Sequence, residues 1–131
     1  MAKNNKLTPV EWEIIDRIWE LGGSPSIREV WENCFPNAEK AYTTVQTIMN
    51  TLEKKGLLER KKIGLVNFYK PIKSREEVVK SEMSNVLKKI FNGSLPALAN
   101  YLINSENLSL EEIEKIKKLL HEKEIELRSL S

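Results

Sequence analysis

The chain has a single cysteine and a single histidine, and so little from which to build a reactive or metal-binding centre. One cysteine, Cys34, excludes an internal disulfide and a Cys-rich metal site within one subunit. Because Cys34 follows Trp31 on an expected helix, we interpret it as a small buried hydrophobe rather than a redox sensor. His121 lies alone among charged residues, which is typical of a solvated helix. We therefore expect no metal, no cofactor and no catalytic activity.

Long apolar runs are also missing. No stretch approaches the roughly 20 apolar residues that a membrane-spanning helix needs. The first residues, MAKNNKLTPVEWE, lack the apolar segment of a signal peptide. At 131 residues the chain is long enough for one core, or for a small domain with an appendage. We expect a cytoplasmic protein that does not insert into a membrane.

The charge is nearly balanced overall, at +2, but it is unevenly distributed. Residues 40–73 hold eight Lys or Arg against two Glu, a net charge of +6, whereas residues 1–39 carry −3 and residues 74–131 carry −1. A local basic patch is the electrostatic mark of phosphate binding, and global charge is a poor guide to it. The basic residues of the patch are Lys40, Lys54, Lys55, Arg60, Lys61, Lys62, Lys70 and Lys73.

Within this basic stretch, residues 41–56 (AYTTVQTIMNTLEKKG) predict an amphipathic helix with an uncharged, hydrogen-bonding outer face. At about 100° per residue, one apolar stripe faces the core: Val45, Ile48, Met49 and Leu52. The opposite face consists of Thr43, Gln46, Thr47, Asn50 and Lys54. Threonine is a poor helix former, so its place there needs a reason other than helix stability. Short hydroxyl and amide side chains suit a DNA major groove; the alternative is a solvated face that happens to be rich in threonine.

Ser or Thr followed three residues later by Glu is the signature of a capping box, which starts a helix. Four pairs have this spacing: Thr8 with Glu11, Ser26 with Glu29, Ser74 with Glu77 and Ser109 with Glu112. They predict a first helix that ends at Gly22-Gly23, with Trp12, Ile15, Ile18 and Trp19 inward, and a second that ends at Pro36-Asn37. The third helix ends at Gly56.

Two strands follow the third helix, Leu57 to Lys62 and Val66 to Tyr69, around a turn at Ile63-Gly64. Val66 and Phe68 alternate with Asn67 and Tyr69, as expected of a hairpin with one packed face. Three helices and a basic hairpin make a winged helix-turn-helix domain, which we assign to residues 1–73. The predicted fold class is mainly α with a small β-hairpin.

Residues 74–131 predict three further helices, the second of them capped by Ser94. Their apolar stripes are more than a short three-helix segment can cover alone. Self-association covers such a face with its own copy, so we expect a homodimer held by this region. The alternative is that the region folds back onto the first domain. The expected dimerisation residues are Val86, Ile90, Leu98, Leu102, Ile116 and Leu120.

Five segments together resemble the penicillinase-repressor (BlaI/MecI/CopY) family over nearly the whole chain. They are LTPVEWEII at 7–15, AYTTVQT at 41–47, LEKKGLLERKK at 52–62, PIKSREE at 71–77 and FNGSLPALANYL at 91–102. The resemblance implies a homodimeric winged-helix repressor that binds a palindromic double-stranded DNA operator through residues 1–72. It also implies dimerisation through the helices that follow.

The resemblance places the recognition helix on Thr43, Thr44, Gln46, Thr47 and Asn50, and the wing on residues 60–69. The amides of Gln46 and Asn50 have the groups to pair bidentately with adenine. The wing tip, residues 63–66, is less polar than many wings of the family. The expected DNA-binding residues beyond the recognition set are Lys54, Arg60, Lys61, Lys62 and Asn67.

The resemblance also bears on how repression ends. Copper-sensing relatives end in paired Cys-x-Cys motifs, which this chain lacks, so metal sensing by that route is excluded. In antibiotic-resistance members a membrane sensor protease cuts an Asn–aromatic bond in the dimerisation region. Asn100-Tyr101 stands at the matching place. The alternative is an ordinary mid-helix pair with Tyr101 packed at the dimer interface.

Two other classes of function are weaker. A winged-helix protein–protein interaction module without specific DNA binding predicts exposed apolar or aromatic residues on the third helix, where the sequence has Thr, Gln, Asn and Lys. An enzyme needs titratable groups gathered in a pocket. The carboxylates here fall mostly at helix caps or on solvated faces, so we expect a DNA-binding repressor.

Overall fold

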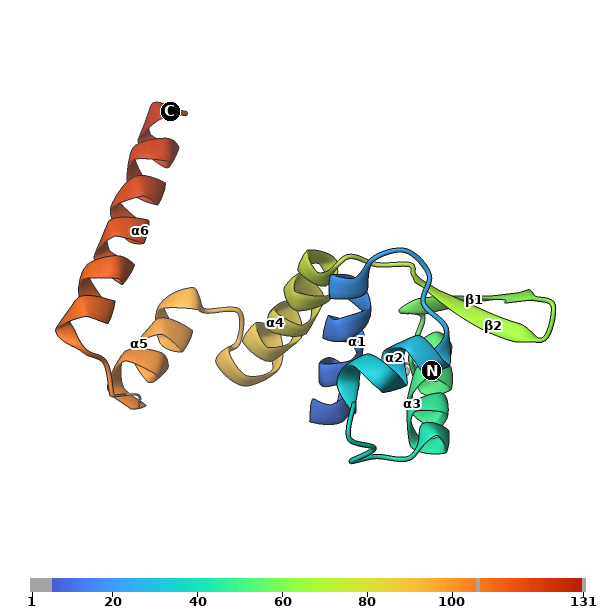
Figure 1. Ribbon diagram of the computed structural model, residues 1–131. Helices are drawn as coiled ribbons and strands as arrows, with labels where there is room; N and C mark the ends of the chain where they lie inside the picture. Colours follow the sequence, from blue (N-terminus) through green and yellow to red (C-terminus); the bar gives the residue numbers. More distant parts are fainter. Residues whose placement is uncertain (1–5, 106, 131) are drawn as a thin grey trace. The chain divides into compact units, whose positions relative to one another are not determined.

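The computed structural model describes residues 6–105 and 107–130, which form six helices and one antiparallel hairpin (Figure 1). In chain order the elements are α1 (Pro9–Leu21), α2 (Ile27–Cys34), α3 (Tyr42–Lys54), β1 (Leu58–Ile63), β2 (Val66–Pro71), α4 (Arg75–Phe91), α5 (Leu95–Ser105) and α6 (Leu110–Ser129). The predicted fold class, mainly α with a small hairpin, is confirmed.

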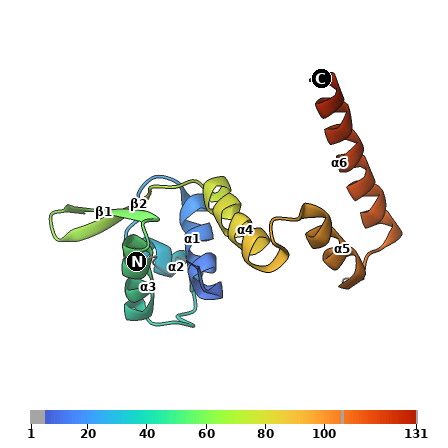
Figure 2. The ribbon, with the colours of Figure 1, turned by 180° about the vertical axis from the view of Figure 1, so that it is seen from behind.

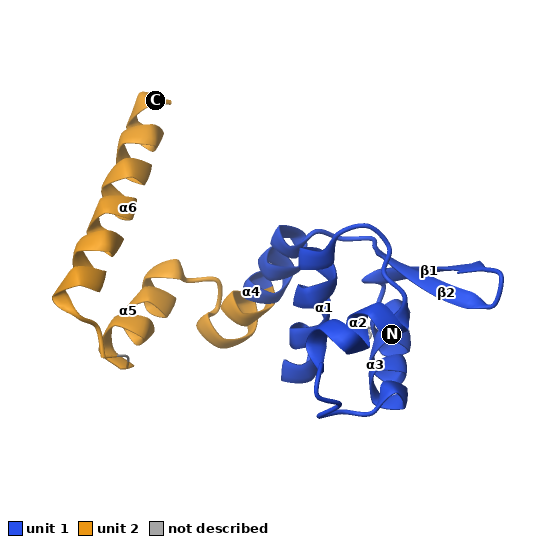
Figure 3. Ribbon diagram, viewed as in Figure 1, with its two compact units in different colours: residues 1–84 blue, residues 85–131 orange. Residues whose placement is uncertain are grey.

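The chain divides into two compact units, residues 1–84 and 85–131, coloured separately in Figure 3. The division falls inside α4, whose first turns belong to the unit that contains α1–α3 and the hairpin. Val78 of α4 is buried in that unit, and Arg75 pairs with Asp16 of α1 at 2.9 Å. The boundary that we predicted between residues 73 and 74 stays a prediction.

The helices begin where the capping boxes predict. At α1 the backbone N–H of Glu11 donates to Thr8 Oγ1, at 3.3 Å, while the backbone N–H of Thr8 donates to Glu11 Oε1, at 2.9 Å. The same reciprocal pair of bonds forms at Ser26, Ser74 and Ser109. Each box satisfies two backbone donors that a helix start leaves unpaired.

The core of the first unit lies between α1, α2 and α3. Its fully buried aliphatic and Met side chains on these helices are Ile14, Ile15, Ile18, Val30, Val45, Met49 and Leu52. The α3 stripe therefore faces the core as predicted, with Ile48 half-buried at its edge. On α1, Ile14 is a core residue that was not predicted, and Trp12 and Trp19 lie half-buried beside the core rather than inside it.

The hairpin differs from the sequence expectation in its turn. Ile63 pairs with Val66, so the turn is Gly64-Leu65 and not Ile63-Gly64. Gly64 has φ +64° as the first central residue of a two-residue turn, a position that glycine occupies without steric cost. The alternation of residues 66–69 also predicted the wrong packed face, with Val66 inward and Tyr69 outward. Tyr69 is buried at 1% exposure, whereas Val66 is exposed.

The base of the hairpin is attached to the helices by backbone hydrogen bonds. The N–H of Tyr69 donates to the carbonyl of Pro25 at 2.9 Å, and Ser26 forms an isolated bridge with Phe68. The N–H of Ile72 donates to the carbonyl of Leu57 at 2.9 Å. Beyond this base the two strands project away from the helices of their unit, as the opposite views of Figures 1 and 2 show.

One ion pair ties the end of α3 to the start of α1. Lys55 Nζ lies 2.6 Å from Glu11 Oε1 and 2.8 Å from the carbonyl of Lys6, and both side chains of the pair are largely buried. Burial alone raises the pKa of Glu11, but the bonds from Lys55 and from the Thr8 backbone outweigh it, and the pKa is lowered. The carboxylate therefore favours the folded state when it is ionised.

We expect Glu11→Gln to destabilise the protein near neutral pH by about 1–3 kcal/mol, because it removes a charge-assisted bond from a buried ammonium. The lowered folded-state pKa means that the stabilisation is present above the unfolded pKa and is lost as the pH falls through the folded pKa. Urea unfolding across acid and neutral pH should show the wild type and the variant converging in acid. The matched control is Glu13→Gln, an exposed glutamate on the same helix. A destabilisation by Glu11→Gln that is independent of pH would contradict this role for the ionised pair.

The second unit has very little core of its own. No described residue of α5 or α6 is buried. Phe91 and Tyr101 form a ring contact at 6.0 Å between centroids, and Val86 and Leu98 are half-buried. Four of the six predicted dimerisation residues are exposed: Ile90, Leu102, Ile116 and Leu120. Among the described helices, none is both long and apolar enough to cross a bilayer.

Candidate nucleic-acid interface

The outer face of α3 is polar and open. Thr43, Thr44, Gln46, Thr47 and Lys54 are all exposed. The Thr47 hydroxyl donates to the carbonyl of Thr43 at 3.0 Å, which leaves its oxygen as an outward acceptor. The helix is thus built as the sequence analysis expected, with an apolar stripe inward and short polar side chains outward.

Asn50 departs from this pattern. Its side chain is half-buried, and its Oδ1 accepts a hydrogen bond from the hydroxyl of Tyr69 on β2 at 2.8 Å. From its helical position Asn50 was expected on the outer face, without a contact to Tyr69. Nothing in the local pattern signals this contact, because the partners lie 19 residues apart on different elements.

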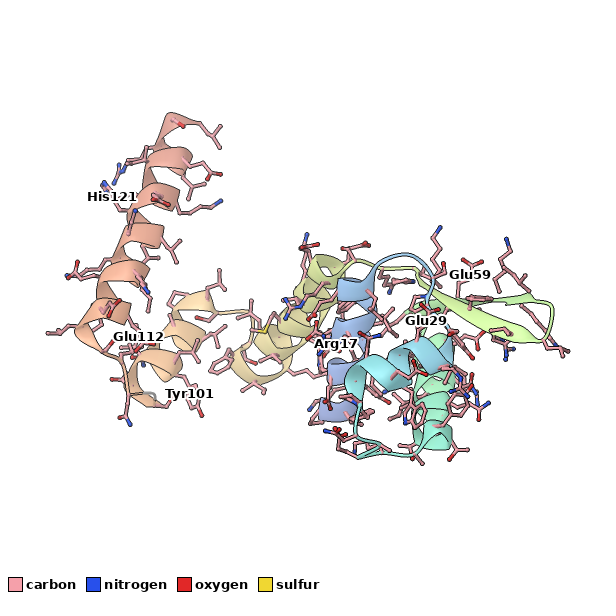
Figure 4. All side chains as sticks on the ribbon, in the orientation of Figure 1. Arg17, Glu29, Glu59, Tyr101, Glu112 and His121 are labelled. Atoms are coloured by element: carbon pink, nitrogen blue, oxygen red, sulfur yellow. The ribbon has the colours of Figure 1, made fainter. Side chains whose placement is uncertain are left out.

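The hairpin brings the basic residues of the wing next to α3. Lys61 and Lys62 are exposed on β1, and Lys62 is the cross-strand partner of half-buried Asn67. Arg60 lies 3.6 Å from Glu53 of α3, so part of its charge is compensated within the protein. Figure 4 shows the side chains of this hairpin, with Glu59 labelled on β1.

Lys55 does not belong to this surface. Its charge was counted in the basic patch, but only 17% of the Lys55 side chain is exposed and its ammonium is bound to Glu11. The neighbouring Lys54 is exposed and remains a candidate for phosphate contact. A charge count along the sequence cannot separate these two lysines, because their difference comes from a partner 44 residues away.

The tip of the hairpin is apolar. Leu65 is 96% exposed, and Ile63 and Val66 are exposed beside it. At the other end of the surface, Tyr42 begins α3 and packs edge-on against Trp31 of α2, with ring centroids 5.8 Å apart. The exposed apolar side chains of the described part of this unit therefore do not form a stripe along the outer face of α3, as a helix-docking module would require.

The described residues contain no group of three His, Cys, Asp or Glu that could hold a metal ion. Cys34 is half-buried, and burial raises the pKa of its thiol. A thiol with a raised pKa carries little thiolate at neutral pH and reacts slowly. This agrees with the interpretation of Cys34 as a packing residue.

A family model described as penicillinase repressor matches residues 7–122. The methicillin resistance regulatory protein MecI of Staphylococcus aureus (strain N315) is 25% identical over 121 residues, which cover 92% of this chain and 98% of that protein. The transcriptional regulator BlaI of Mycobacterium tuberculosis (strain ATCC 25618 / H37Rv) is 28% identical over 125 residues, 95% of this chain and 89% of that protein. These relatives are named as regulators, not as enzymes.

Among solved structures, the DNA-binding domain of the repressor BlaI matches with a TM-score of 0.51 and 28% sequence identity. The match covers 59% of this chain and 93% of that domain. The matched structure is a DNA-binding domain, and α1–α3 with the hairpin form a unit of the same kind here. It confirms the predicted winged-helix fold.

Proposed function

Because the chain belongs to the penicillinase repressor family of transcriptional repressors, we propose that it is a homodimer that represses transcription by binding a palindromic DNA operator. The observation that carries this proposal is the exposed polar face of α3 beside a basic hairpin, within the unit that resembles a DNA-binding domain. Helix side chains would read base edges in the major groove, while lysines on the hairpin would contact phosphates.

Selection of bound sites from random duplex DNA tests the proposal directly. A homodimer should enrich an inverted repeat whose half-sites are centred about 10 base pairs, or a multiple of this, apart. A monomeric reader should enrich a single half-site. If no sequence is enriched, specific DNA binding is refuted and the alternative of a protein–protein interaction module takes its place.

The second unit supports the dimer. Apolar side chains recur along one side of α6 at three-, four- and seven-residue spacing, as in a helix that packs against a partner, and all but the half-buried Ile113 are exposed. The positions of this stripe, which we call the α6 stripe, are Ile113, Ile116, Leu120 and Leu127. Each Leu or Ile that moves from water into an interface contributes about 1.5–3 kcal/mol. A second copy is the economical cover for such a surface.

Base and phosphate contacts should separate on mutation. Gln46→Ala should cost about 1–3 kcal/mol per half-site and relax preference at one base pair, because an exposed amide on α3 would be lost from a base edge. Lys62→Ala should weaken all duplexes about equally, because phosphates carry no sequence information. Binding measured against the operator and its single-base variants separates the two patterns. A change of base preference in Lys62→Ala, without one in Gln46→Ala, would reverse the assignment.

We propose that repression ends through the second unit, by cleavage of the Asn100-Tyr101 bond by a membrane sensor protease. Tyr101 projects from α5 and is 58% exposed (Figure 4). The helix that holds the bond has no buried residue, so opening it locally costs little. A cut there would separate α6 from the rest of the chain and remove its stripe from the dimer.

The variant Asn100→Ala with Tyr101→Ala should repress normally but fail to respond to inducer in the native host, because the protease would lack its bond. An immunoblot should show a fragment of residues 1–100 after induction of the wild type and none for the variant. The matched control is Asn104→Ala, which removes the hydrogen bond to Asn100 and leaves the Asn100-Tyr101 peptide bond unchanged. Normal induction of the double variant would show that this bond is not the switch.

The proposal includes a cytoplasmic location, because a repressor works in the compartment that holds its operator. No cofactor is part of the proposal, since side chains of the protein itself would make both the DNA contacts and the dimer contacts. Release of the operator then depends on the integrity of the dimer and not on a bound metal.

A further inference from the structure

Two polar contacts join α3 to the hairpin, one made by Arg60 of β1 and one by Tyr69 of β2. Glu53 holds Arg60 at 3.6 Å, and Arg60 is the cross-strand partner of Tyr69. The Tyr69 hydroxyl then meets Asn50 Oδ1 at 2.8 Å. Tyr69 is 1% exposed, and its backbone N–H is bonded to Pro25, so the ring has no room to move away.

The hydrogen positions in the Tyr69–Asn50 contact follow from the donors available. An amide oxygen has no proton to donate, so the Tyr69 hydroxyl is the donor in its hydrogen bond to Asn50 Oδ1. Burial raises the pKa of Tyr69, while Arg60 partly opposes the rise, and the phenol stays protonated at neutral pH. The hydroxyl proton of Tyr69 is therefore engaged in the hydrogen bond to Asn50 Oδ1. The amide oxygen of Asn50 faces the hairpin, and its NH₂ group faces the other way.

Among the described residues, the Asn50 side chain makes its hydrogen bond through Oδ1; none accepts a hydrogen bond from its NH₂ group, which is not shut away from solvent. Asn50 lies one helical turn after Gln46 on the side of α3 that carries the exposed polar residues. At the edge of this face, the NH₂ group of Asn50 is therefore available to donate a hydrogen bond to bound DNA. The acceptor half of the amide, by contrast, is already used.

We propose that Asn50 reads DNA as a hydrogen-bond donor only, that its partner is the N7 of a guanine, and that Tyr69 is the positioning residue that fixes this polarity. The inference rests on the proposed operator binding and sharpens it. Bidentate pairing with adenine needs the amide oxygen and nitrogen on the same base edge. With Oδ1 turned to Tyr69, guanine is favoured, because it offers two acceptors there and adenine places a donor beside its N7.

The test uses the full chain and the operator found by selection. The base pair that depends on Asn50 is first located as the one whose preference disappears in Asn50→Ala. At that position, replacing guanine by 7-deazaguanine, which lacks the N7 acceptor, should weaken wild-type binding about tenfold per half-site and leave Asn50→Ala unchanged. Tyr69→Phe frees the amide to rotate, so its preference for guanine over adenine should fall about tenfold while its salt dependence stays the same.

Asn50→Asp keeps an oxygen acceptor for Tyr69 and removes the NH₂ donor. It therefore separates base recognition by this residue from its contribution to the stability of the fold. It should unfold at a urea concentration close to the wild type and lose the guanine preference. Adenine preference at the Asn50-dependent base pair, or Tyr69→Phe with unchanged discrimination, would overturn the inference, as would the absence of any base pair that depends on Asn50. If the wild type selects no sequence at all, the proposed function fails first and the inference falls with it.

Discussion

Replacing Ile116 and Leu120 together by aspartate should convert the proposed dimer into a monomer. Both residues belong to the α6 stripe and are exposed within one copy, at 37% and 66%. In a two-fold interface each replacement counts twice, and burying four carboxylates would cost far more than the lost apolar contact. Sedimentation at micromolar concentration should give the mass of one chain for the variant and of two chains for the wild type.

The same variant should bind the operator about 10²- to 10⁴-fold more weakly, because two linked half-sites gain from effective concentration and two separate chains do not. Circular dichroism should show that the helices and the winged-helix unit are retained. The matched control is Ile125→Asp, an equally apolar-to-acidic change on the opposite side of α6. It should stay dimeric and keep its affinity. A wild type that sediments as a monomer, or a double variant that remains dimeric, would show that the α6 stripe is not the interface.

Local patterns in the sequence located most of the fold. A capping box spans three residues, so Thr8 with Glu11 and Ser26 with Glu29 identify helix starts without any knowledge of tertiary structure. The apolar spacing of α3 likewise shows its inner side, because the 3.6-residue period is a property of the helix alone. The outer face follows by exclusion, and the exposed Thr43, Gln46 and Thr47 were found in this way.

Contacts between distant elements were out of reach for the same reason. Lys55 reads as one more basic residue next to Lys54, until the fold places it against Glu11. By its position in the alternation, Tyr69 was expected on the polar side of its strand. In the fold its ring is buried and its hydroxyl donates a hydrogen bond to Asn50. In both pairs, chain topology and not local pattern decides the partner. The sequence therefore identified the exposed polar face of α3 but not the hydrogen bond that orients Asn50.

The hairpin shows how one residue of register changes an assignment. Glycine signals a turn but does not say which of the two central positions it takes. With Gly64 first and Leu65 second, Ile63 joins β1, and the exposed apolar tip consists of Ile63, Leu65 and Val66. Lys61 and Lys62, which precede the tip on β1, then lie at positions fixed by pairing with Phe68 and Asn67.

Operator binding should weaken steeply with salt. With Lys55 bound to Glu11, the cations left near the DNA are Lys40, Lys54, Arg60, Lys61 and Lys62. If each subunit places about three or four of them on phosphates, the dimer neutralises roughly six to eight, and the log–log salt slope is about −5 to −7. Affinity should then fall about 10³- to 10⁴-fold between roughly 50 and 200 mM salt.

The double variant Lys61→Ala with Lys62→Ala should flatten this slope by about 3 to 4, since a dimer would lose about four phosphate contacts. The matched control is Lys117→Ala with Lys118→Ala on α6, which removes the same charge from exposed lysines outside the interface and should leave the slope unchanged. Lys55→Met should also leave the slope unchanged while lowering the stability, because its ammonium serves Glu11 and not the DNA. A slope near zero for the wild type would remove the electrostatic basis of the interface, and an altered slope in Lys55→Met would return that lysine to it.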